Sequence, residues 1–250
     1  MTKLSYTGLS IKGKKAKINE DYLITPLSIE NSKLTEKGHF FVLCDGIGGH
    51  NSGEIASKLC SEYFFRDYFE TEIDEEISGW LEKEIKNLNK TLKQKSREKA
   101  KYNGMGTTLV NLLIKDDNAY INNVGDSRLY IYTDHLRQIT EDHSPVWKFF
   151  KMGIITKDEM LKSRIKNVLS QGIGLDIKVE INSYKIRCPE KFIFLLCSDG
   201  LTDVTIDSEI ENLFSKTTNL QQCVEDLYDL SQKNGSRDDV SLILVSNYQD

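Results

Sequence analysis

The sequence of 250 residues predicts an α+β fold in which antiparallel sheets are covered by helices. Three observations predict this class. Short apolar runs typical of strands occur in clusters, helices with one apolar face lie between the clusters, and the regular strand–helix alternation of a doubly wound sheet is absent. The predicted strands are residues 22–29, 40–44, 107–114, 119–124, 129–132, 179–186, 191–197 and 240–245.

Two amphipathic helices are predicted after the first strands. Apolar residues recur at helical spacing over residues 55–64, and again in a second set that is wholly Ile and Leu. The second set is Ile77, Leu81, Ile85, Leu88 and Leu92. Because each helix has one apolar face, each must cover a flat surface. The charged run from Lys83 to Lys101 is interpreted as the solvated face of the second helix.

The second half of the chain continues this pattern. A turn is expected at Asp116-Asp117-Asn118, between two strands, and a mixed stretch with short helices at residues 142–175. Two further helices are predicted at residues 206–215 and 220–232, before the last strand. The sequence has only three prolines and no low-complexity linker, so we expect one domain over residues 1–250.

Composition excludes several classes of function and indicates a compartment. The 33 Lys and Arg against 38 Asp and Glu give a net charge of −5, so general binding to nucleic acid is not expected. The N-terminus has no signal-peptide core, and no apolar run reaches the roughly 20 residues that span a membrane. Five scattered cysteines without a C-x-x-C pair are typical of buried free thiols, which predicts a cytoplasmic protein.

The most informative local pattern is an apolar strand that ends in Asp-Gly. It occurs twice, at Asp45-Gly46 and at Asp199-Gly200. Each pair alone is most often only a turn. Two further acidic pairs, Glu20-Asp21 and Asp238-Asp239, stand where predicted strands begin. Several carboxylates at strand ends can converge on one point of a rigid sheet.

Clustered carboxylates need cations, because like charges a few Å apart cannot all stay ionised. Mg²⁺ and Mn²⁺ prefer oxygen ligands, and a glycine after a ligand Asp lets its carbonyl approach the ion. Two such ions can activate water and clamp a phosphoryl group, so the residues predict a two-metal hydrolase. The near match to a phosphate-binding loop at residues 8–15 has Lys15 where Ser or Thr must reach Mg²⁺, and the four histidines lack zinc-protease spacing.

Taken together, seven short motifs resemble the bacterial type of the metal-dependent protein phosphatases of the protein phosphatase 2C family. The resemblance extends over nearly the whole chain, in the order that the family has. The motifs are Asn19-Glu20-Asp21, Asp45-Gly46-Ile47-Gly48-Gly49-His50, Gly104-Met105-Gly106-Thr107-Thr108, Val124-Gly125-Asp126-Ser127-Arg128, Asp142-His143-Ser144, Ser198-Asp199-Gly200-Leu201 and Asp238-Asp239-Val240-Ser241. One such string is weak evidence, whereas seven in order are strong.

The resemblance implies a central β-sandwich of two antiparallel sheets with helices on both outer faces and metals at one end. It implies that Asp45 bridges two Mg²⁺ or Mn²⁺ ions, with the carbonyl of Gly46 on one of them. Asp199 and Asp238 complete the other shell, and a third, weaker ion is expected at Asp126 with Asp199. Glu20 and Asp21 act at the first ion, directly or through water. Residues 145–175 match the flap beside the active site.

The implied reaction is attack on phosphorus by a metal-bridged hydroxide, so Asp45, Asp199 and Asp238 act catalytically through bound metals and water. One departure concerns phosphate binding, because Ala16 occupies the position of the family's phosphate-binding Arg. Neighbouring Lys15 and Lys17 can supply a point charge but not a bidentate fork.

Two more departures lie within the motifs. Ile47 stands where eukaryotic relatives have a histidine that is expected to protonate the leaving group. Bacterial members also lack this histidine, and water, free or bound at Asp126, can substitute for it. Asp239 replaces the usual Asn, and two interpretations are open: its charge tightens metal binding, or it faces solvent.

The resemblance implies a monomeric enzyme that hydrolyses phosphoserine and phosphothreonine in proteins and opposes a Ser/Thr protein kinase. Membrane and nucleic-acid partners are not expected. The alternative is a pseudo-phosphatase, a regulatory module that binds phosphoproteins without turnover. Ala16 supports this alternative, and the complete set of metal carboxylates opposes it.

Overall fold

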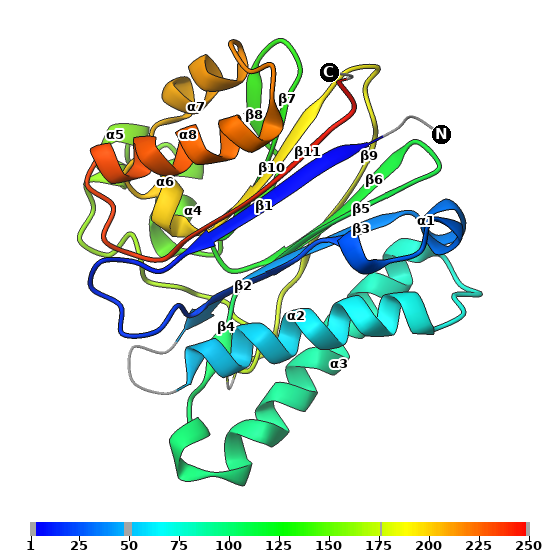
Figure 1. The fold of residues 1–250 in the computed structure, drawn as a ribbon. Coiled ribbons are helices and arrows are strands. Elements are labelled where there is room, and N and C mark those ends of the chain that lie inside the picture. Colours follow the sequence, from blue (N-terminus) through cyan, green and yellow to red (C-terminus); the bar gives the residue numbers. More distant parts are fainter. Residues whose placement is uncertain (1–3, 48–51, 176, 249–250) are drawn as a thin grey trace.

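The computed structural model describes residues 4–47, 52–175 and 177–248. Within these residues, two antiparallel sheets face each other and helices cover the outer side of each (Figure 1). This is the predicted α+β sandwich. The two ends of the chain lie at one end of the sandwich, whereas β4 and the loops that carry the acidic motifs lie toward the other (Figure 1).

The first sheet holds both the first and the last strand of the described chain. Its order is β1-β11-β10-β7-β8, and every neighbouring pair is antiparallel. The strands are β1 (Ser5–Ile11), β7 (Arg128–Tyr132), β8 (Leu136–Gln138), β10 (Ile193–Cys197) and β11 (Val240–Ser246). The central strands β10 and β11 are buried along their whole length, as continuous apolar runs predict.

The second sheet has the order β2-β3-β5-β6-β9, with β4 paired to the end of β3. Its strands are β2 (Asp21–Ile24), β3 (His39–Ile47), β4 (Gly106–Thr107), β5 (Leu109–Lys115), β6 (Asn118–Val124) and β9 (Asn182–Arg187). The predicted turn between β5 and β6 is present, because Asp116 and Asp117 both have positive φ, as a tight hairpin requires.

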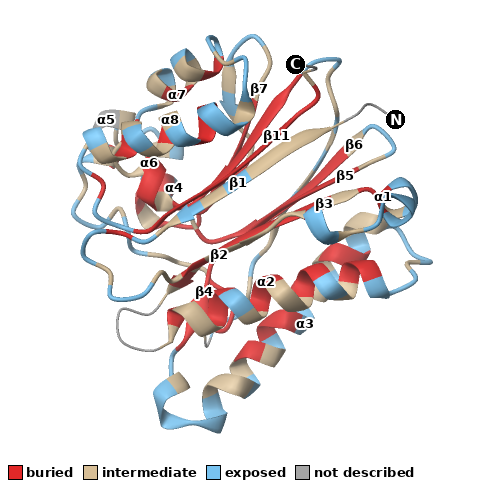
Figure 2. Cartoon of the chain, in the orientation of Figure 1, coloured by how far each residue is buried: buried red, intermediate tan, exposed pale blue. Residues whose placement is uncertain are grey.

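The helices form the two outer layers. Against the second sheet lie α2 (Gly53–Glu70) and α3 (Ile77–Glu98), and against the first lie α6 (Asp199–Thr202), α7 (Asp207–Phe214) and α8 (Leu220–Lys233). Shorter elements complete the fold: η1 (Pro26–Ser28), α1 (Asn31–Lys37), η2 (Ala100–Tyr102), α4 (Pro145–Lys151) and α5 (Lys157–Leu161). Figure 2 shows buried residues concentrated on the sheets and on the inner helix faces.

Alternation along the strands divides the apolar side chains among three layers. Odd and even residues of a strand point to opposite faces, so Phe41 and Leu43 of β3 enter the core between the sheets, whereas Phe40 and Val42 pack under α2 and α3. The inter-sheet core also contains Phe194 and Leu196 of β10. The site-bearing loops are therefore anchored by strands that are buried on both faces.

The structure corrects the first 37 residues of the sequence prediction. The strand expected at residues 22–29 ends at Ile24, and η1 and α1 follow it. The near phosphate-binding loop begins instead as strand β1, which was not predicted, because Ser and Gly interrupt its apolar pattern. No helix among the described residues is both long and apolar enough to cross a membrane.

Candidate metal centre

Acidic residues from distant parts of the chain meet at the end of the sandwich opposite the chain termini. Asp21 begins β2 and is the register partner of Asp45 near the end of β3. Asp199 follows β10, Asp238 precedes β11, and Asp126 lies in the turn between β6 and β7. Because neighbouring strands are antiparallel, a strand that ends at this edge is next to one that begins there, which brings these motifs together.

The backbone of Asp45 is held by the two threonines of the predicted Gly-x-Gly-Thr-Thr motif. The Thr107 hydroxyl donates to the Asp45 carbonyl at 2.8 Å, and the Asp45 N–H donates to Thr108 Oγ1 at 2.9 Å. Thr108 Oγ1 also lies 2.7 Å from Ser127 Oγ, beside Asp126. These hydrogen bonds, two partly buried and one buried, restrict where the Asp45 carboxylate can point.

Three glycines allow the site loops to pack against one another. A Cβ on Gly46 would lie 2.4 Å from the Gly53 carbonyl carbon, and one on Gly200 would lie 1.9 Å from the backbone carbonyl oxygen of Asp239. A Cβ on Gly13 would lie 2.4 Å from the carbonyl carbon of Asp238. Any side chain at these positions would push the loops apart, so glycine is required for close approach of the backbones.

Asp21 is the most enclosed of the five acids. Its carboxylate accepts a hydrogen bond from Ser198 Oγ at 2.8 Å, and the Ser198 oxygen in turn accepts from the Ser241 N–H at 3.0 Å. Ser198 belongs to the Ser-Asp-Gly-Leu motif, so the motif both supplies Asp199 and orients Asp21. Asp45, Asp126 and Asp199 are half-buried, whereas Asp238 is exposed.

The pKa values of these carboxyls are raised, first by burial and then by neighbouring carboxylates. Burial raises the pKa of Asp21 to about 7, against hydrogen bonds from Ser241 and Ser198 that lower it. Burial likewise raises the pKa of Asp126 to about 7, with Asp142 adding to the effect. The pKa values of Asp45, Asp199 and Asp238 are raised too, by burial and by neighbouring carboxylates. The five acids therefore form one electrostatically coupled cluster.

This cluster fits hard divalent cations. Its donors are carboxylate oxygens, the type that Mg²⁺ and Mn²⁺ prefer, and their raised pKa values mark like charges that a cation would relieve. In the described part of the chain, no three His, Cys, Asp or Glu side chains converge closely enough to enclose one ion by themselves. The fit is therefore one of donor chemistry and charge, with room for water ligands.

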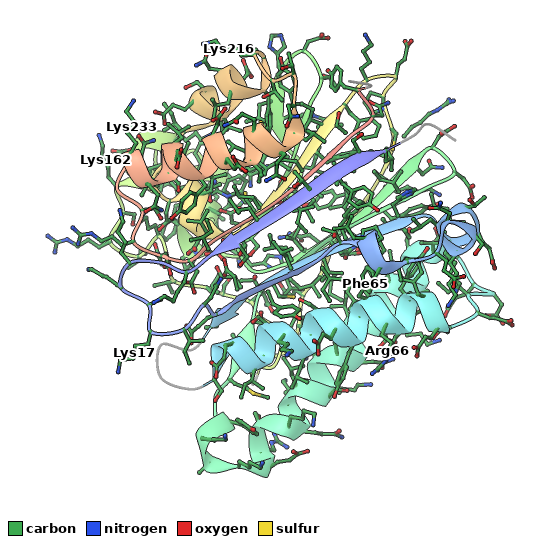
Figure 3. The ribbon with its side chains drawn as sticks, viewed as in Figure 1. Lys17, Phe65, Arg66, Lys162, Lys216 and Lys233 are labelled. Atoms are coloured by element: carbon green, nitrogen blue, oxygen red, sulfur yellow. The ribbon has the colours of Figure 1, made fainter. Side chains whose placement is uncertain are left out.

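Glu20 and the two candidate phosphate-binding lysines lie at the margin of the cluster. Glu20 is half-buried, and its backbone carbonyl accepts hydrogen bonds from the Gly46 N–H at 3.0 Å and from Ser57 Oγ at 2.5 Å. Lys15 and Lys17 are exposed in the loop after β1, and Lys17 projects outward (Figure 3). The roles expected of these three side chains stay predictions, as do those of residues 48–50, which lie outside the described residues.

Asp239 does not face solvent, which corrects one of the two interpretations. It is buried, with one oxygen accepting from the Gly13 N–H and the other from the Glu20 N–H, both at 2.7 Å. The carboxylate thus spans the loop between β1 and β2 and ties it to the loop that carries Asp238. An Asn has one acceptor oxygen on its side chain, so a carboxylate is better suited to two N–H donors.

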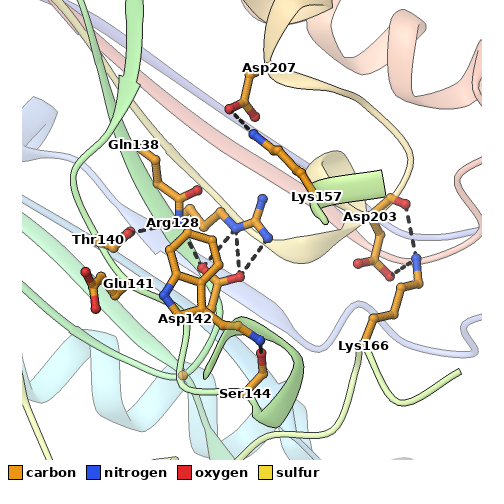
Figure 4. Close-up of polar contacts among 12 residues, drawn as sticks. Arg128, Gln138, Thr140, Glu141, Asp142, Ser144, Lys157, Lys166, Asp203 and Asp207 are labelled. Atoms are coloured by element: carbon orange, nitrogen blue, oxygen red, sulfur yellow. Dashed lines mark hydrogen bonds and ion pairs between the residues drawn. The ribbon is translucent and has the colours of Figure 1, made fainter. Parts of the chain in front are cut away.

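A second buried charged group borders the site and differs in kind. Arg128 and Asp142 form a multiply hydrogen-bonded pair, with Arg128 Nη2 2.6 Å from Asp142 Oδ2 and Nε 3.0 Å from both oxygens (Figure 4). Gln138 Nε2 donates to Asp142 at 2.9 Å, and the Arg128 guanidinium lies 5.9 Å from the Trp147 ring centroid. The pair therefore connects β7 to α4 at the start of the predicted flap.

The segment that the resemblance predicts to be a flap packs beside part of the acidic cluster. Lys166 forms an ion pair of 2.9 Å with Asp203, at the end of α6 (Figure 4). A small cavity beside this contact is lined by Asp126 and Asp199 from the cluster and by Met160 and Lys166 from the flap. The flap ends where Ile173 bridges Thr107, which connects it to β4.

Sequence reasoning named the acids but missed the residues that position them. Ser198, Thr107 and Thr108 appeared only as letters of motifs, and their hydrogen bonds to Asp21 and Asp45 were not predicted. The signal was present, because small hydroxyl residues beside buried acids are typical donors. The cysteines take no part in the cluster: all five are free and four are buried, whereas Cys188 is only partly so.

A sandwich with a coupled carboxylate cluster at one end defines the class of metal-dependent phosphatases. Residues 7–148 match the family model for protein phosphatase 2C, and the chain belongs to this family. The chain is 34% identical over 208 residues to the serine/threonine phosphatase stp of Listeria monocytogenes serotype 4b (strain F2365), which covers 82% of each protein. This family membership is of the bacterial type that the seven motifs predict.

Solved structures agree with the sequence comparison. Serine/threonine phosphatase Stp1 from Staphylococcus aureus superposes with a TM-score of 0.89 at 32% identity, over 100% of this chain and 96% of that one. The catalytic domain of the phosphatase PstP, in complex with two manganese ions, gives a TM-score of 0.82 at 25% identity, with 97% of each chain covered. The family, fold class and enzyme class predicted from sequence are thereby confirmed, and none of these relatives favours the pseudo-phosphatase alternative.

Proposed function

We propose that the protein hydrolyses phosphoserine and phosphothreonine in proteins at the cluster of Asp21, Asp45, Asp126, Asp199 and Asp238. The observation that carries this proposal is the mutual electrostatic coupling of the five carboxyls at one end of the sandwich. Similarity to named serine/threonine phosphatases over most of the chain supports the substrate class. No covalent phosphoenzyme is needed, so the cysteines have no catalytic role.

The residues expected to hold two Mg²⁺ or Mn²⁺ ions are Asp45, the Gly46 carbonyl, Asp199 and Asp238, with Glu20 and Asp21 assisting. When bound, such ions supply an acidified water as nucleophile and positive charge for the phosphoryl oxygens. Thr107 and Thr108 hold the Asp45 backbone, and Ser198 orients the Asp21 carboxylate. The two manganese ions in the PstP structure support the core pair, and a third, weaker ion is proposed at Asp126.

The exposed side chains of the predicted flap support a protein as the natural substrate. Large apolar side chains are exposed along it, including Met152 at 72% and Ile154 at 64% of their surface. An exposed apolar patch beside an active site is typical of a protein-binding surface. Phe149, Ile165 and Val168 of the same segment are exposed as well.

Several finer expectations remain part of the proposal. We propose that the protein acts in the cytoplasm as a monomer, as a single catalytic domain over residues 1–250, and opposes a Ser/Thr protein kinase. The five free thiols support a reducing compartment. Lys15 and Lys17 are proposed to attract the substrate phosphate in place of an Arg at position 16.

The test is metal-dependent hydrolysis of p-nitrophenyl phosphate and of a phosphothreonine peptide. With Mn²⁺ we expect turnover of both, and we expect it to vanish in EDTA and to fall at least roughly a thousandfold in Asp45→Asn and Asp238→Asn. Full activity in these variants would overturn the proposal. Asp126→Ala should lower turnover by a smaller factor. Equilibrium dialysis should show that this variant still binds the two core ions. Unchanged kinetics at saturating metal would contradict a third ion.

A further inference from the structure

The C-terminal part of α3 and the η2 turn carry a dense positive charge. Residues 90–101, which we name the basic arm, contain six basic residues and one acidic residue, a local charge of +5 in a chain whose net charge is −5. The basic residues are Lys90, Lys93, Lys95, Arg97, Lys99 and Lys101, and the acidic residue is Glu98. A concentration of one sign on an acidic protein marks a surface for an anionic partner.

The interpretation of the charged run as an ordinary solvated helix face holds for the first half of α3 only. There Lys83 pairs with Glu75 at 3.0 Å and Lys86 with Glu82 at 3.7 Å, so acids and bases alternate. The basic arm has no such alternation in its sequence. Complementing the helix dipole accounts for Lys95 and Arg97 in the last turn but not for lysines beyond the end of the helix.

Those lysines are held outside the helix by an aromatic ring. The ammonium groups of Lys99 and Lys101 lie 5.6 and 5.0 Å from the centroid of the Tyr102 ring. Such cation–π contacts favour a defined position for both charges. Both lysines and Lys90 are exposed, and Figure 2 shows this end of α3 among the exposed parts of the molecule.

The basic arm is joined directly to the scaffold of the metal centre. Ser52 Oγ, at the start of α2, donates to the Lys101 carbonyl at 3.1 Å. Five residues after Lys101 the chain enters β4, where Thr107 donates to the Asp45 carbonyl at 2.8 Å. Figure 1 shows this end of α3 projecting from the same end of the sandwich as β4. A polypeptide whose phosphorylated residue is at the metal centre can therefore extend over the arm.

We propose that the basic arm binds acidic residues that flank the phosphorylated residue of protein substrates, so that the enzyme favours phosphosites in acidic sequences. Exposed lysines attract carboxylates, and this attraction offsets repulsion between an acidic enzyme and an acidic substrate. The arm exposes no large apolar side chain that could enter a membrane, which argues against a lipid surface. This inference rests on the proposed phosphatase function.

The experiment compares two phosphothreonine peptides of equal length, one with Asp and Glu flanks and one with Asn and Gln at the same positions. The variant is Lys90→Gln/Lys95→Gln/Lys99→Gln/Lys101→Gln. We expect its kcat/KM on the acidic peptide to fall about 5- to 30-fold, mainly through KM and less at high salt. Its kcat/KM on the neutral peptide and on p-nitrophenyl phosphate should stay within about twofold, because the metal centre is unchanged.

A matched control removes four exposed positive charges at the opposite end of the sandwich: Lys33→Gln/Arg187→Gln/Lys191→Gln/Lys216→Gln. It has the same net charge as the arm variant and should retain the preference for the acidic peptide. The inference would be overturned if both variants lost the same factor in kcat/KM on the acidic peptide. It would also be overturned if the arm variant lost the same factor on both peptides. Unchanged peptide kinetics with lost binding to single-stranded RNA or to anionic vesicles would overturn it in favour of that partner.

Binding separates this inference from the proposed function. If the wild-type protein with Mn²⁺ hydrolyses no p-nitrophenyl phosphate, the proposed function fails. Fluorescence anisotropy of the two labelled peptides then still tests the arm. Tighter binding of the acidic peptide that the arm variant loses would support the inference, and equal binding of both peptides would refute it.

Discussion

Two groups of charges that are at least partly buried lie close together at one end of the sandwich and differ in how they are compensated. The Asp21, Asp45, Asp126, Asp199 and Asp238 cluster contains acids alone, and the pKa of each is raised. The Arg128–Asp142 pair contains one charge of each sign with several hydrogen bonds between them, and the pKa of Arg128 is raised, which keeps it charged. In the proposed function, metal ions balance the charge of the acids, whereas the pair is balanced within the protein.

This difference separates a functional site from a structural one. An uncompensated cluster costs stability in the metal-free protein and gains it on binding cations, which is the behaviour expected of the proposed metal site. A compensated pair needs no ligand, and breaking it leaves one charge buried alone. Asp239 is an intermediate case, since two backbone N–H groups rather than a cation satisfy its carboxylate.

Breaking the Arg128–Asp142 pair should have the largest effect on stability. We expect Arg128→Met to lower the free energy of unfolding by about 3–5 kcal/mol, because Asp142 is left buried without its partner. Urea denaturation monitored by tryptophan fluorescence measures this change. The double variant Arg128→Met/Asp142→Leu should recover most of the loss, and a single variant as stable as the wild type would show that the pair has no structural role.

The pH dependence of stability should separate the two groups next. Raised carboxyl pKa values mean that the acid cluster favours the folded state fully below about pH 4, and that this contribution is lost as pH rises through about 7. For Asp21 or Asp126, the contribution of one carboxyl to the free energy of unfolding is at most about 4 kcal/mol. In EDTA, the free energy of unfolding should therefore fall between about pH 4 and 7.

Variants and metal provide the controls for this pH effect. Asp21→Asn or Asp126→Asn should flatten the decline, because the amide does not ionise. Mn²⁺ should stabilise the wild type more at pH 8 than at pH 5, since protons compete with the ion for the carboxylates. A metal-free protein whose stability rises steadily from pH 5 to 8 would contradict the assignment of the cluster as uncompensated.

Asp239→Asn should have the smallest effect of the three. The amide oxygen can accept from only one of the Gly13 and Glu20 N–H groups, so we expect a loss of about 1–3 kcal/mol in the free energy of unfolding. The affinity for Mn²⁺, measured by calorimetry, should fall as well, because the loop before Asp21 is held less firmly. Unchanged stability and affinity would mean that the tie is dispensable.

Sequence patterns predicted the parts of the fold that repeat a simple period. The second helix was predicted from Ile77 because its apolar residues recur every three or four positions, and α3 begins there. The strand β1 and helix α1 were missed, because Gly8 and Ser10 break one pattern and α1 buries only Leu34. Short elements depend on contacts with distant strands, such as the pairing of β1 with β11, and local sequence does not encode them.

For the site, the sequence by itself predicted which side chains carry the chemistry. Asp-Gly at strand ends and seven ordered motifs identified the acids and the family, because metal chemistry constrains residue types and their local spacing. Only the tertiary structure decided which groups hold those acids and where each charge is directed. Ser198 meets Asp21 across 177 residues of chain and Asp239 meets Gly13 across 226, because antiparallel sheets bring remote loops to one edge. Such contacts follow from packing, and no local pattern contains them.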